Sequence, residues 1–260
     1  MALLLALAAA PAARAASDLV AVRVLEGWRG ADGAHMAALE LRLKPGWKTY
    51  WRAPGDAGIP PSFDWRRSRN VAAIDVLWPA PSVSVKSGVR TIGYADVLVL
   101  PLSVAPARAG ADVTLAGSMD IGVCSDVCVP VTLHFSSDLP QAASKRDPRI
   151  AAALASRPLT AAEAGVGRVA CRLSPIDGGL ALRAEIDMPP AGGRELALVE
   201  VDDPQIWVAQ PKTAREGGRL VAETSLYHVE GRSFLLNRSG IRITVLGQSR
   251  AVDIQGCTAG

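Results

Sequence analysis

The chain has few of the residues that most often form catalytic sites. Its 260 residues include three histidines and four cysteines, and His35, His134 and His228 have no evident acidic partner in the sequence. No phosphate-binding loop, Ser/His/Asp arrangement or pair of carboxylates stands out. The net charge is only +3 and no basic stripe with interleaved aromatics is present, which disfavours a nucleic-acid partner. We expect no cofactor, and the cysteines are the remaining candidates for chemistry.

Long hydrophobic runs are missing beyond the first residues. After Leu19 no apolar stretch approaches the roughly 18 residues that a membrane-spanning helix needs, so no membrane span is expected. Residues 1–10 are apolar, and Ala13–Ala15 has the small-x-small pattern of a cleavage site, although a positively charged start is absent. No cysteine follows that would carry a lipid anchor. We interpret residues 1–15 as a signal peptide and expect a soluble periplasmic protein.

Helical periodicity is scarce, whereas glycine and proline are frequent, with 24 and 18 residues. Apolar and polar residues alternate over Leu39–Lys44 and again over Leu180–Asp187, as in half-buried strands. Turn signals separate these short segments. The chain is therefore predicted to be all-β, with a β-sandwich over residues 16–140 and a second, small β-sandwich over residues 168–260.

Residues 141–167 differ in character from both flanking regions. Asp147 and Pro148 are suited to the N-cap and first turn of a helix, and Pro158 ends the Ala-rich stretch after them. Thr160–Glu163 has the spacing of a capping box, which predicts a second short helix closed by the next glycine. We interpret 141–167 as a short helical linker between the two domains.

The four cysteines allow three disulfide pairings. Cys124 and Cys128 are four positions apart, and two exported thiols so close are expected to form a disulfide. Cys171 lies in the first strand expected in the second domain and Cys257 just after the last. A structural bridge between them would close a long loop and stabilise the domain by about 4 kcal/mol. The short bridge would stabilise less, so the Cys124/Cys128 pair is the better candidate for redox chemistry.

Two other interpretations of the Cys124/Cys128 pair remain open from the residues alone. One is an inert bridge in a structural adaptor. The other is a copper-handling binding protein, in which Met119 and His134 join the cysteines as soft ligands of Cu(I). Asp126 lies between the two sulfurs and disfavours a thiolate there. The pair would then be a poor nucleophile but a target for the thiolate of another protein.

An ordered set of motifs extends over the first domain. It comprises Gly46–Pro61, Phe63–Trp65, Trp78-Pro79, Ile92–Tyr94 and Cys124–Pro130. In this order the motifs resemble the periplasmic N-terminal region of DsbD-type thiol:disulfide interchange proteins, and most of all the ScsB-like branch, which is linked to copper tolerance. The resemblance implies an immunoglobulin-like sandwich. It also implies a protein-disulfide reductase module that takes electrons from a thioredoxin-like domain or membrane thiol transporter and passes them to periplasmic disulfide proteins.

The resemblance also implies roles for single residues. Cys128 would form the mixed disulfide with a partner, and Cys124 would resolve it. Three aromatic residues would support the pair: Tyr50, Trp51 and Tyr94. The stretch that corresponds to the family's aromatic cap loop, residues 83–88, contains no aromatic residue here. Full-length members continue into transmembrane helices and a thioredoxin-like domain, so the chain is expected to be a stand-alone module or a part of such a protein.

Overall fold

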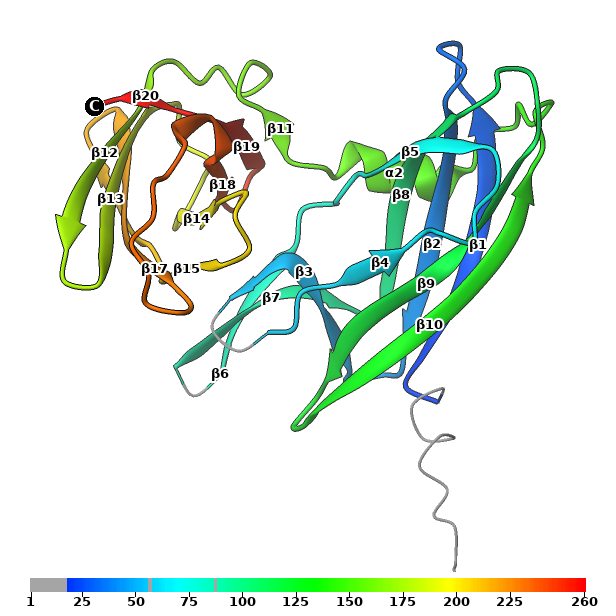
Figure 1. Cartoon of the computed structure of the whole chain (residues 1–260), viewed down its shortest axis with the longest axis horizontal. Helices are drawn as coiled ribbons and strands as arrows, with labels where there is room; N and C mark the ends of the chain where they lie inside the picture. Colours follow the sequence, from blue (N-terminus) through cyan, green and yellow to red (C-terminus); the bar gives the residue numbers. More distant parts are fainter. Residues whose placement is uncertain (1–17, 56–57, 87) are drawn as a thin grey trace, which may run out of the picture. The chain divides into compact units, whose positions relative to one another are not determined.

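The computed structural model describes residues 18–55, 58–86 and 88–260. The chain divides into two compact units, Met1–Ala155 and Ser156–Gly260, and most of the regular structure in both is β-strand (Figure 1). The expected all-β class is therefore confirmed. The expected signal peptide, residues 1–15, lies outside the described residues. None of the helices in the described part is long and apolar enough to cross a membrane.

The first unit is an immunoglobulin-like sandwich of two antiparallel sheets (Figure 1). One sheet has the order β1-β2-β8-β5. Its strands are β1 (Val20–Arg29), β2 (His35–Leu43), β8 (Val97–Pro106) and β5 (Val71–Val76). The other has the order β10-β9-β3-β7-β6, and β4 adds to β9. Its strands are β10 (Cys128–Leu139), β9 (Val113–Cys124), β3 (Lys48–Gly55), β7 (Val89–Ala95), β6 (Ser82–Lys86) and β4 (Ser62–Asp64).

The core of the first unit contains side chains from both sheets. Leu39 and Leu41 of β2 are fully buried, and Met119, Ile121 and Val123 of β9 belong to the same cluster. Each fully buried side chain of this size contributes about 1.5–3 kcal/mol relative to an exposed one. Successive side chains of a strand point to opposite faces. Since Met119, Ile121 and Val123 point into the core, the residues of β9 that alternate with them face outward.

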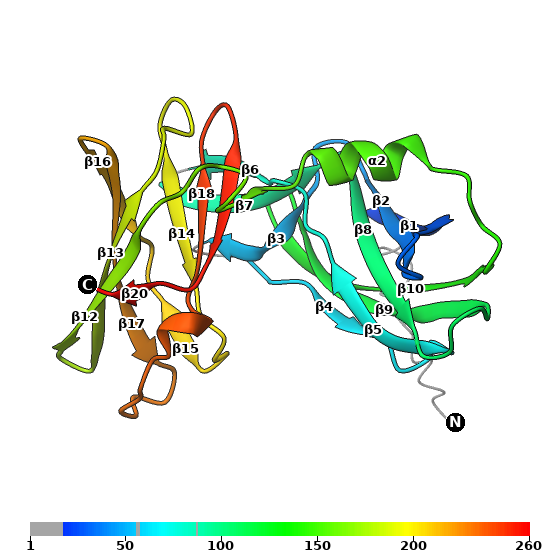
Figure 2. The ribbon, with the colours of Figure 1, turned by 90° about the horizontal axis from the view of Figure 1, so that it is seen from above.

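The helix α2 (Pro148–Ala155) belongs to the first unit, which corrects its interpretation as part of a linker between domains. The helix lies on the β1-β2-β8 sheet (Figure 2). Its Ile150 is fully buried and packs with Leu25 and Ala38. Gly27, with a φ of +68°, is required first by the backbone of β2, since a Cβ there would collide with the carbonyl oxygen of Met36; it would also lie 3.1 Å from Cδ1 of Ile150. The sequence pattern predicted the helix, whereas its position on the sheet depends on the burial of Ile150.

The second helix expected in this region is not formed. The hydrogen bonds of the capping box are present, from the Thr160 N–H to Oε2 of Glu163 (2.8 Å) and from the Glu163 N–H to Oγ1 of Thr160 (3.2 Å). Leu159–Thr160 is instead the strand β11, and the residues up to Gly165 form turns. Five residues after the cap are too few to offset the cost of helix nucleation.

The second unit also has two sheets (Figure 2). The first has the order β11-β19-β18-β14, with β19 (Ala251–Gln255), β18 (Arg242–Leu246) and β14 (Leu196–Glu200). The second has the order β15-β17-β13-β12-β20, and β16 also pairs with β17. Its strands are β15 (Ile206–Val208), β17 (Arg219–His228), β13 (Gly179–Asp187), β12 (Val169–Ile176), β20 (Thr258–Ala259) and β16 (Lys212–Glu216). One core cluster joins both sheets, with Leu182 and Ile243 fully buried.

Candidate functional site

Cys124 and Cys128 lie at the tip of the longest hairpin of the first unit. The strand β9 ends at Cys124 and β10 begins at Cys128, so residues 125–127 form the turn. The antiparallel register places the two cysteines directly opposite each other. Their sulfurs are joined in a disulfide, and their Cα atoms are 4.1 Å apart.

The two cysteines differ in accessibility. The alternation along β9 sends Val123 into the core, so Cys124 lies on the outer face of the sheet. Cys124 is nevertheless only 1% exposed, whereas Cys128 is exposed. A thiolate of another molecule can therefore approach Cys128 more easily than Cys124.

Tyr50 of β3 contacts the accessible cysteine. Its Oη lies 3.2 Å from Sγ of Cys128, and because a disulfide sulfur has no hydrogen, the tyrosine hydroxyl is the donor. A Cβ at Gly122 would lie 3.1 Å from Cε2 of Tyr50 and 3.0 Å from Cβ of Ile59, so the glycine allows both side chains to cover this part of β9. Burial raises the pKa of Tyr50, which keeps the hydroxyl protonated.

Lys48 links the cysteine strand to the β6–β7 hairpin. It is directly opposite Cys124 in the β3–β9 register. Its Nζ donates to Oγ1 of Thr91 (2.9 Å) and to Oγ of Ser84 (3.4 Å). The described part of stretch 83–88, the expected counterpart of a cap loop, belongs to this hairpin. Sequence reasoning missed Lys48, although it lies inside the motif Gly46–Pro61.

The structure does not bring Tyr94 to the disulfide. In the register Tyr94 is opposite Thr49, which is in turn opposite Val123. Tyr94 therefore lies on the core side of the sheet, away from Tyr50, and its hydroxyl donates to the carbonyl oxygen of Pro79 (2.7 Å). Burial raises the pKa of Tyr94 far above its usual value.

Trp51 and Asp126, the remaining residues expected near the pair, differ in position. Trp51 is fully buried, and the guanidinium of Arg52 lies 4.0 Å from the centre of its ring. Asp126 is exposed in the turn between the cysteines. Beside it, Val127 is 64% exposed, so the turn presents an apolar side chain next to Cys128.

The soft ligands considered for copper do not meet. Met119 is fully buried on the core face of β9, opposite to the face of Cys124. His134 is exposed but lies six residues from Cys128 along β10, roughly 20 Å in an extended strand. In the described ranges no three His, Cys, Asp or Glu side chains form a group that could hold a metal ion. The geometry gives no support to a copper site made of these residues.

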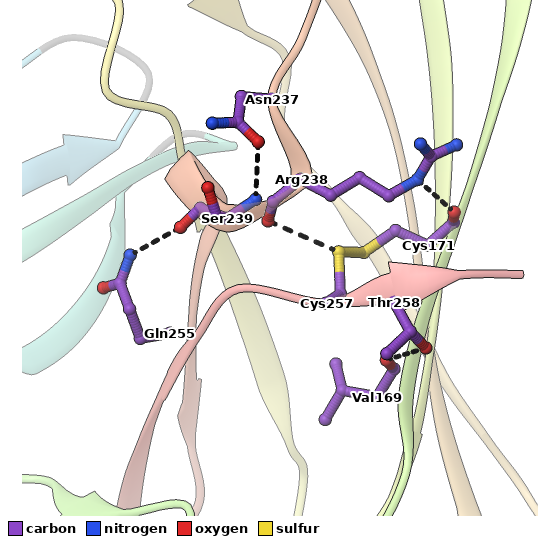
Figure 3. Close-up of a disulfide and its surroundings, with 8 residues drawn as sticks. All are labelled: Val169, Cys171, Asn237, Arg238, Ser239, Gln255, Cys257 and Thr258. Atoms are coloured by element: carbon purple, nitrogen blue, oxygen red, sulfur yellow. Dashed lines mark hydrogen bonds between the residues drawn. A yellow bond between two sulfur atoms is a disulfide. The ribbon is translucent and has the colours of Figure 1, made fainter.

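The disulfide between Cys171 and Cys257 has a different setting (Figure 3). Cys171 is fully buried in β12, and its carbonyl oxygen accepts a hydrogen bond from Nε of Arg238 (3.1 Å). Next to Cys257, Thr258 donates from Oγ1 to the carbonyl oxygen of Val169 (3.0 Å). The bridge and this short β20 pairing hold residues 257–259 against the first long strand of the unit.

The fold and the hairpin define the class of the first unit, which is an immunoglobulin-like domain with a surface disulfide at a hairpin tip. Residues 19–140 match the family model described as "Thiol:disulfide interchange protein DsbD, N-terminal". These residues form a DsbD-type N-terminal domain, a thiol–disulfide interchange domain, and the resemblance inferred from the motifs is confirmed.

A solved structure resembles the chain over both units. It is the N-terminal periplasmic domain of ScsB from Proteus mirabilis, with a TM-score of 0.69 and 20% sequence identity over 94% of this chain and 95% of that chain. At this identity the likeness shows the fold alone. No curated protein matches the chain. The family model ends at residue 140 and does not reach the second unit.

Proposed function

We propose that the protein is a periplasmic protein-disulfide reductase module that relays reducing equivalents through Cys124 and Cys128. The observation that carries the proposal is the unequal setting of the pair. Cys128 is exposed and its sulfur accepts a hydrogen bond from Tyr50, whereas Cys124 is buried. One exposed and one buried cysteine suit an exchange that starts at a single end of the bridge.

In the reducing half-reaction a thiolate of the donor attacks Sγ of Cys128. The Cys124–Cys128 bond breaks, and its electron pair leaves on Sγ of Cys124, which takes up a proton. A second donor thiolate then attacks the donor sulfur of the mixed disulfide, and Cys128 leaves as a thiolate. The donor has become a disulfide, and the pair has gained two electrons.

Tyr50 favours the last of these steps and the onward transfer. Its hydroxyl can donate to the Cys128 thiolate as it does to the disulfide sulfur, and a hydrogen bond to the charged form stabilises that form. The thiolate then attacks the disulfide of an acceptor protein, and Cys124 resolves the new mixed disulfide. This assignment gives the hydrogen-bonding role to Tyr50 and none to Tyr94.

The proposed donor is a thioredoxin-like domain or a membrane thiol transporter, and the proposed acceptors are periplasmic disulfide proteins. Protein partners are supported by the apolar side chains near Cys128, since Val127 is 64% and Ile59 is 40% exposed. The family name of residues 19–140 supports the same reaction. A periplasmic location is supported by the likeness to a periplasmic domain of ScsB and by the signal-like pattern of residues 1–15.

A trapping experiment tests the proposed roles. Cys124→Ser leaves the accessible Cys128 thiol, so we expect it to form a covalent complex on a non-reducing gel with a thioredoxin-like domain that keeps only its attacking cysteine, activated as a mixed disulfide with 2-nitro-5-thiobenzoate, which is the leaving group. Cys128→Ser leaves only the buried thiol and should trap little. The matched control is Cys171→Ser/Cys257→Ser, which keeps the hairpin pair and should react without accumulating a complex.

Equal trapping by both single variants, or trapping only through Cys124, would show that the roles are wrong. Failure of a reduced thioredoxin-like domain to reduce the hairpin disulfide of the unmodified protein would favour the inert bridge. Tight Cu(I) binding by the reduced protein without any exchange would favour the copper-handling alternative.

A further inference from the structure

The ring of Tyr50 is flanked by two glycines that come from different parts of the first unit. Gly122 belongs to β9, and Gly58 lies between β3 and β4. A Cβ at Gly122 would lie 3.1 Å from Cε2 of Tyr50, whereas a Cβ at Gly58 would lie 2.7 Å from Cδ1 and 2.9 Å from Cε1 of the same ring. The two glycines therefore adjoin opposite edges of the ring, and a larger side chain at either position would press on it.

The backbone does not require glycine at either of these positions. Neither residue has a φ in the left-handed region, where glycine is the default residue. A Cβ at Gly122 would meet the side chains of Ile59 and Tyr50 first. Gly117, earlier in β9, differs, since a Cβ there would collide with the carbonyl oxygen of Asp64 at 2.2 Å. The small size of Gly122 thus serves the side chains that pack on it.

Residues 58 and 59 fold back over Tyr50. A Cβ at Gly58 would lie 2.2 Å from Cβ of Pro54, so the chain returns close to the strand β3 that it has left. The next residue, Ile59, lies over Gly122, because its Cβ and Cδ1 would be 3.0 and 3.2 Å from a Cβ there. The ring is covered as a result, and Tyr50 is only 2% exposed.

A buried hydrogen bond holds β9 next to the ring. The pairing of β3 with β9 ends at Thr49 and Val123. Oγ1 of Thr49 donates to the carbonyl oxygen of Gly122 (3.0 Å), and Thr49 is 1% exposed. This hydrogen bond extends the contact between the two strands by one residue of β9. Gly122 is thereby fixed as one wall of the space that the Tyr50 ring occupies.

The position of the ring sets the hydrogen bond to the disulfide. Oη of Tyr50 lies 3.2 Å from Sγ of Cys128, at the end of a rigid ring whose direction depends on two side-chain torsions. Hydrogen bonds weaken steeply when they lengthen or bend. A displaced ring would therefore weaken the contact that stabilises the Cys128 thiolate in the proposed reaction.

We propose that Gly122 and Gly58 are positioning residues for thiol–disulfide exchange. They leave the space in which the Tyr50 ring is held with its hydroxyl on Sγ of Cys128, and they act on the thiolate through that hydroxyl. The inference rests on the proposed function, but its test measures Cys128 without any partner protein. An intact effect of the glycines together with absent trapping would contradict the relay alone, and the reverse result would contradict this inference alone.

The test measures the alkylation of Cys128 by iodoacetamide as a function of pH, in a Cys124→Ser background. The backbone allows Gly122→Ala, but the added Cβ fits only if Tyr50 or Ile59 moves. We expect the pKa of the Cys128 thiol to rise, because the hydrogen bond to its thiolate is weakened. The rise should not exceed that of Tyr50→Phe, which removes the hydrogen bond altogether and is worth up to about one unit.

A second variant reaches the ring from its other edge. Gly58→Ala should raise the pKa of the Cys128 thiol in the same direction, and it carries the test independently of Gly122→Ala. The matched control is Gly218→Ala in the second unit, which adds the same methyl group where nothing lies within 4 Å and should leave this pKa unchanged. An unchanged pKa in both variants at the ring would overturn the proposal.

A double-variant comparison separates positioning from a general loss of packing. In a Tyr50→Phe background the hydroxyl is absent, so Gly122→Ala should cause no further rise in the pKa of the Cys128 thiol. Lys48, opposite Cys124 in the register, and Asp126 of the turn keep their charges in all of these variants. An equal rise with and without the hydroxyl would show that the glycine does not act through Tyr50, and it would also overturn the proposal.

Discussion

The two disulfides of this protein lie in opposite structural settings. Cys124 and Cys128 are separated by 4 positions at the tip of a hairpin, with one cysteine exposed. Cys171 and Cys257 are separated by 86 positions, and Cys171 is fully buried. A bridge that closes a long loop restricts the unfolded chain strongly, and a bridge that closes a short loop restricts it little. The long-range bridge is therefore expected to contribute more to stability, and the hairpin bridge is the one for which we propose thiol–disulfide exchange.

The largest effect is expected from removing the long-range bridge. Cys171→Ala/Cys257→Ala should lower the free energy of unfolding of the second unit by about 4–5 kcal/mol, the loop-entropy value for a separation of 86 positions. Urea unfolding followed by hydrogen exchange of peptides from each unit measures this. The first unit serves as an internal control and should unfold as before.

The same change in the hairpin should have a smaller effect. Cys124→Ala/Cys128→Ala should lower the free energy of unfolding of the first unit by about 2 kcal/mol, because only a short loop is released. A loss in the first unit as large as that in the second would contradict the division between a stabilising and a reactive disulfide.

The hydrogen bond from Tyr50 should stabilise the Cys128 thiolate by about 1 kcal/mol. In a Cys124→Ser background, Tyr50→Phe removes the donor to Sγ of Cys128, so the pKa of the Cys128 thiol should rise by up to about one unit. The pH dependence of alkylation by iodoacetamide measures this pKa. Tyr94→Phe, on the opposite face of the sheet, is the matched control, and an equal shift from both would remove the role proposed for Tyr50.

The smallest effect concerns acid sensitivity. His35 is buried in β2, with its Nε2 2.6 Å from the carbonyl oxygen of Glu26 and its Nδ1 without a partner among the described residues. Burial lowers the pKa of His35 in the folded protein. Folding therefore favours the neutral form of His35. The contribution of this residue to stability is complete above a pH of about 6.5, the pKa of histidine in the unfolded chain, and is lost as the pH falls below that value.

The first unit should accordingly be less stable in urea at pH 5.5 than at pH 7.5, while His35→Gln should reduce this difference. A first unit that becomes more stable over the same pH decrease would contradict the assignment.

Much of the fold could be predicted from local pattern. The alternation over Leu39–Lys44 corresponds to the end of β2 and the residue after it, and that over Leu180–Asp187 lies within β13. The helix at Pro148 was indicated by its N-cap, but its place in the first unit depends on Ile150, Leu25 and Ala38, which are far apart in the sequence. The capping box at Thr160 formed its hydrogen bonds without a helix, because the spacing specifies the cap and not the length of the segment after it.

The candidate site was predictable in part. Tyr50 and Tyr94 both lie in motifs that carry the family resemblance. Only the strand register shows that they lie on opposite faces of the sheet. The buried state of Cys124 and the exposed state of Cys128 also depend on neighbouring strands. The contact of Tyr50 with Cys128 joins residues 78 positions apart, and a sequence pattern contains no information at that range without a family to supply it.

The packing of α2 on the first unit determines where this unit can be separated from the rest of the chain. Arg149 of this helix donates to Oε2 of Glu40 at 2.9 Å, and the Glu40 side chain is fully buried. A fragment cut at residue 140, where the family match ends, would uncover Leu25 and Ala38 and take one of the arginines from that carboxylate. The unit that can be transplanted intact therefore ends after Ala155, fifteen residues beyond the boundary that sequence comparison draws.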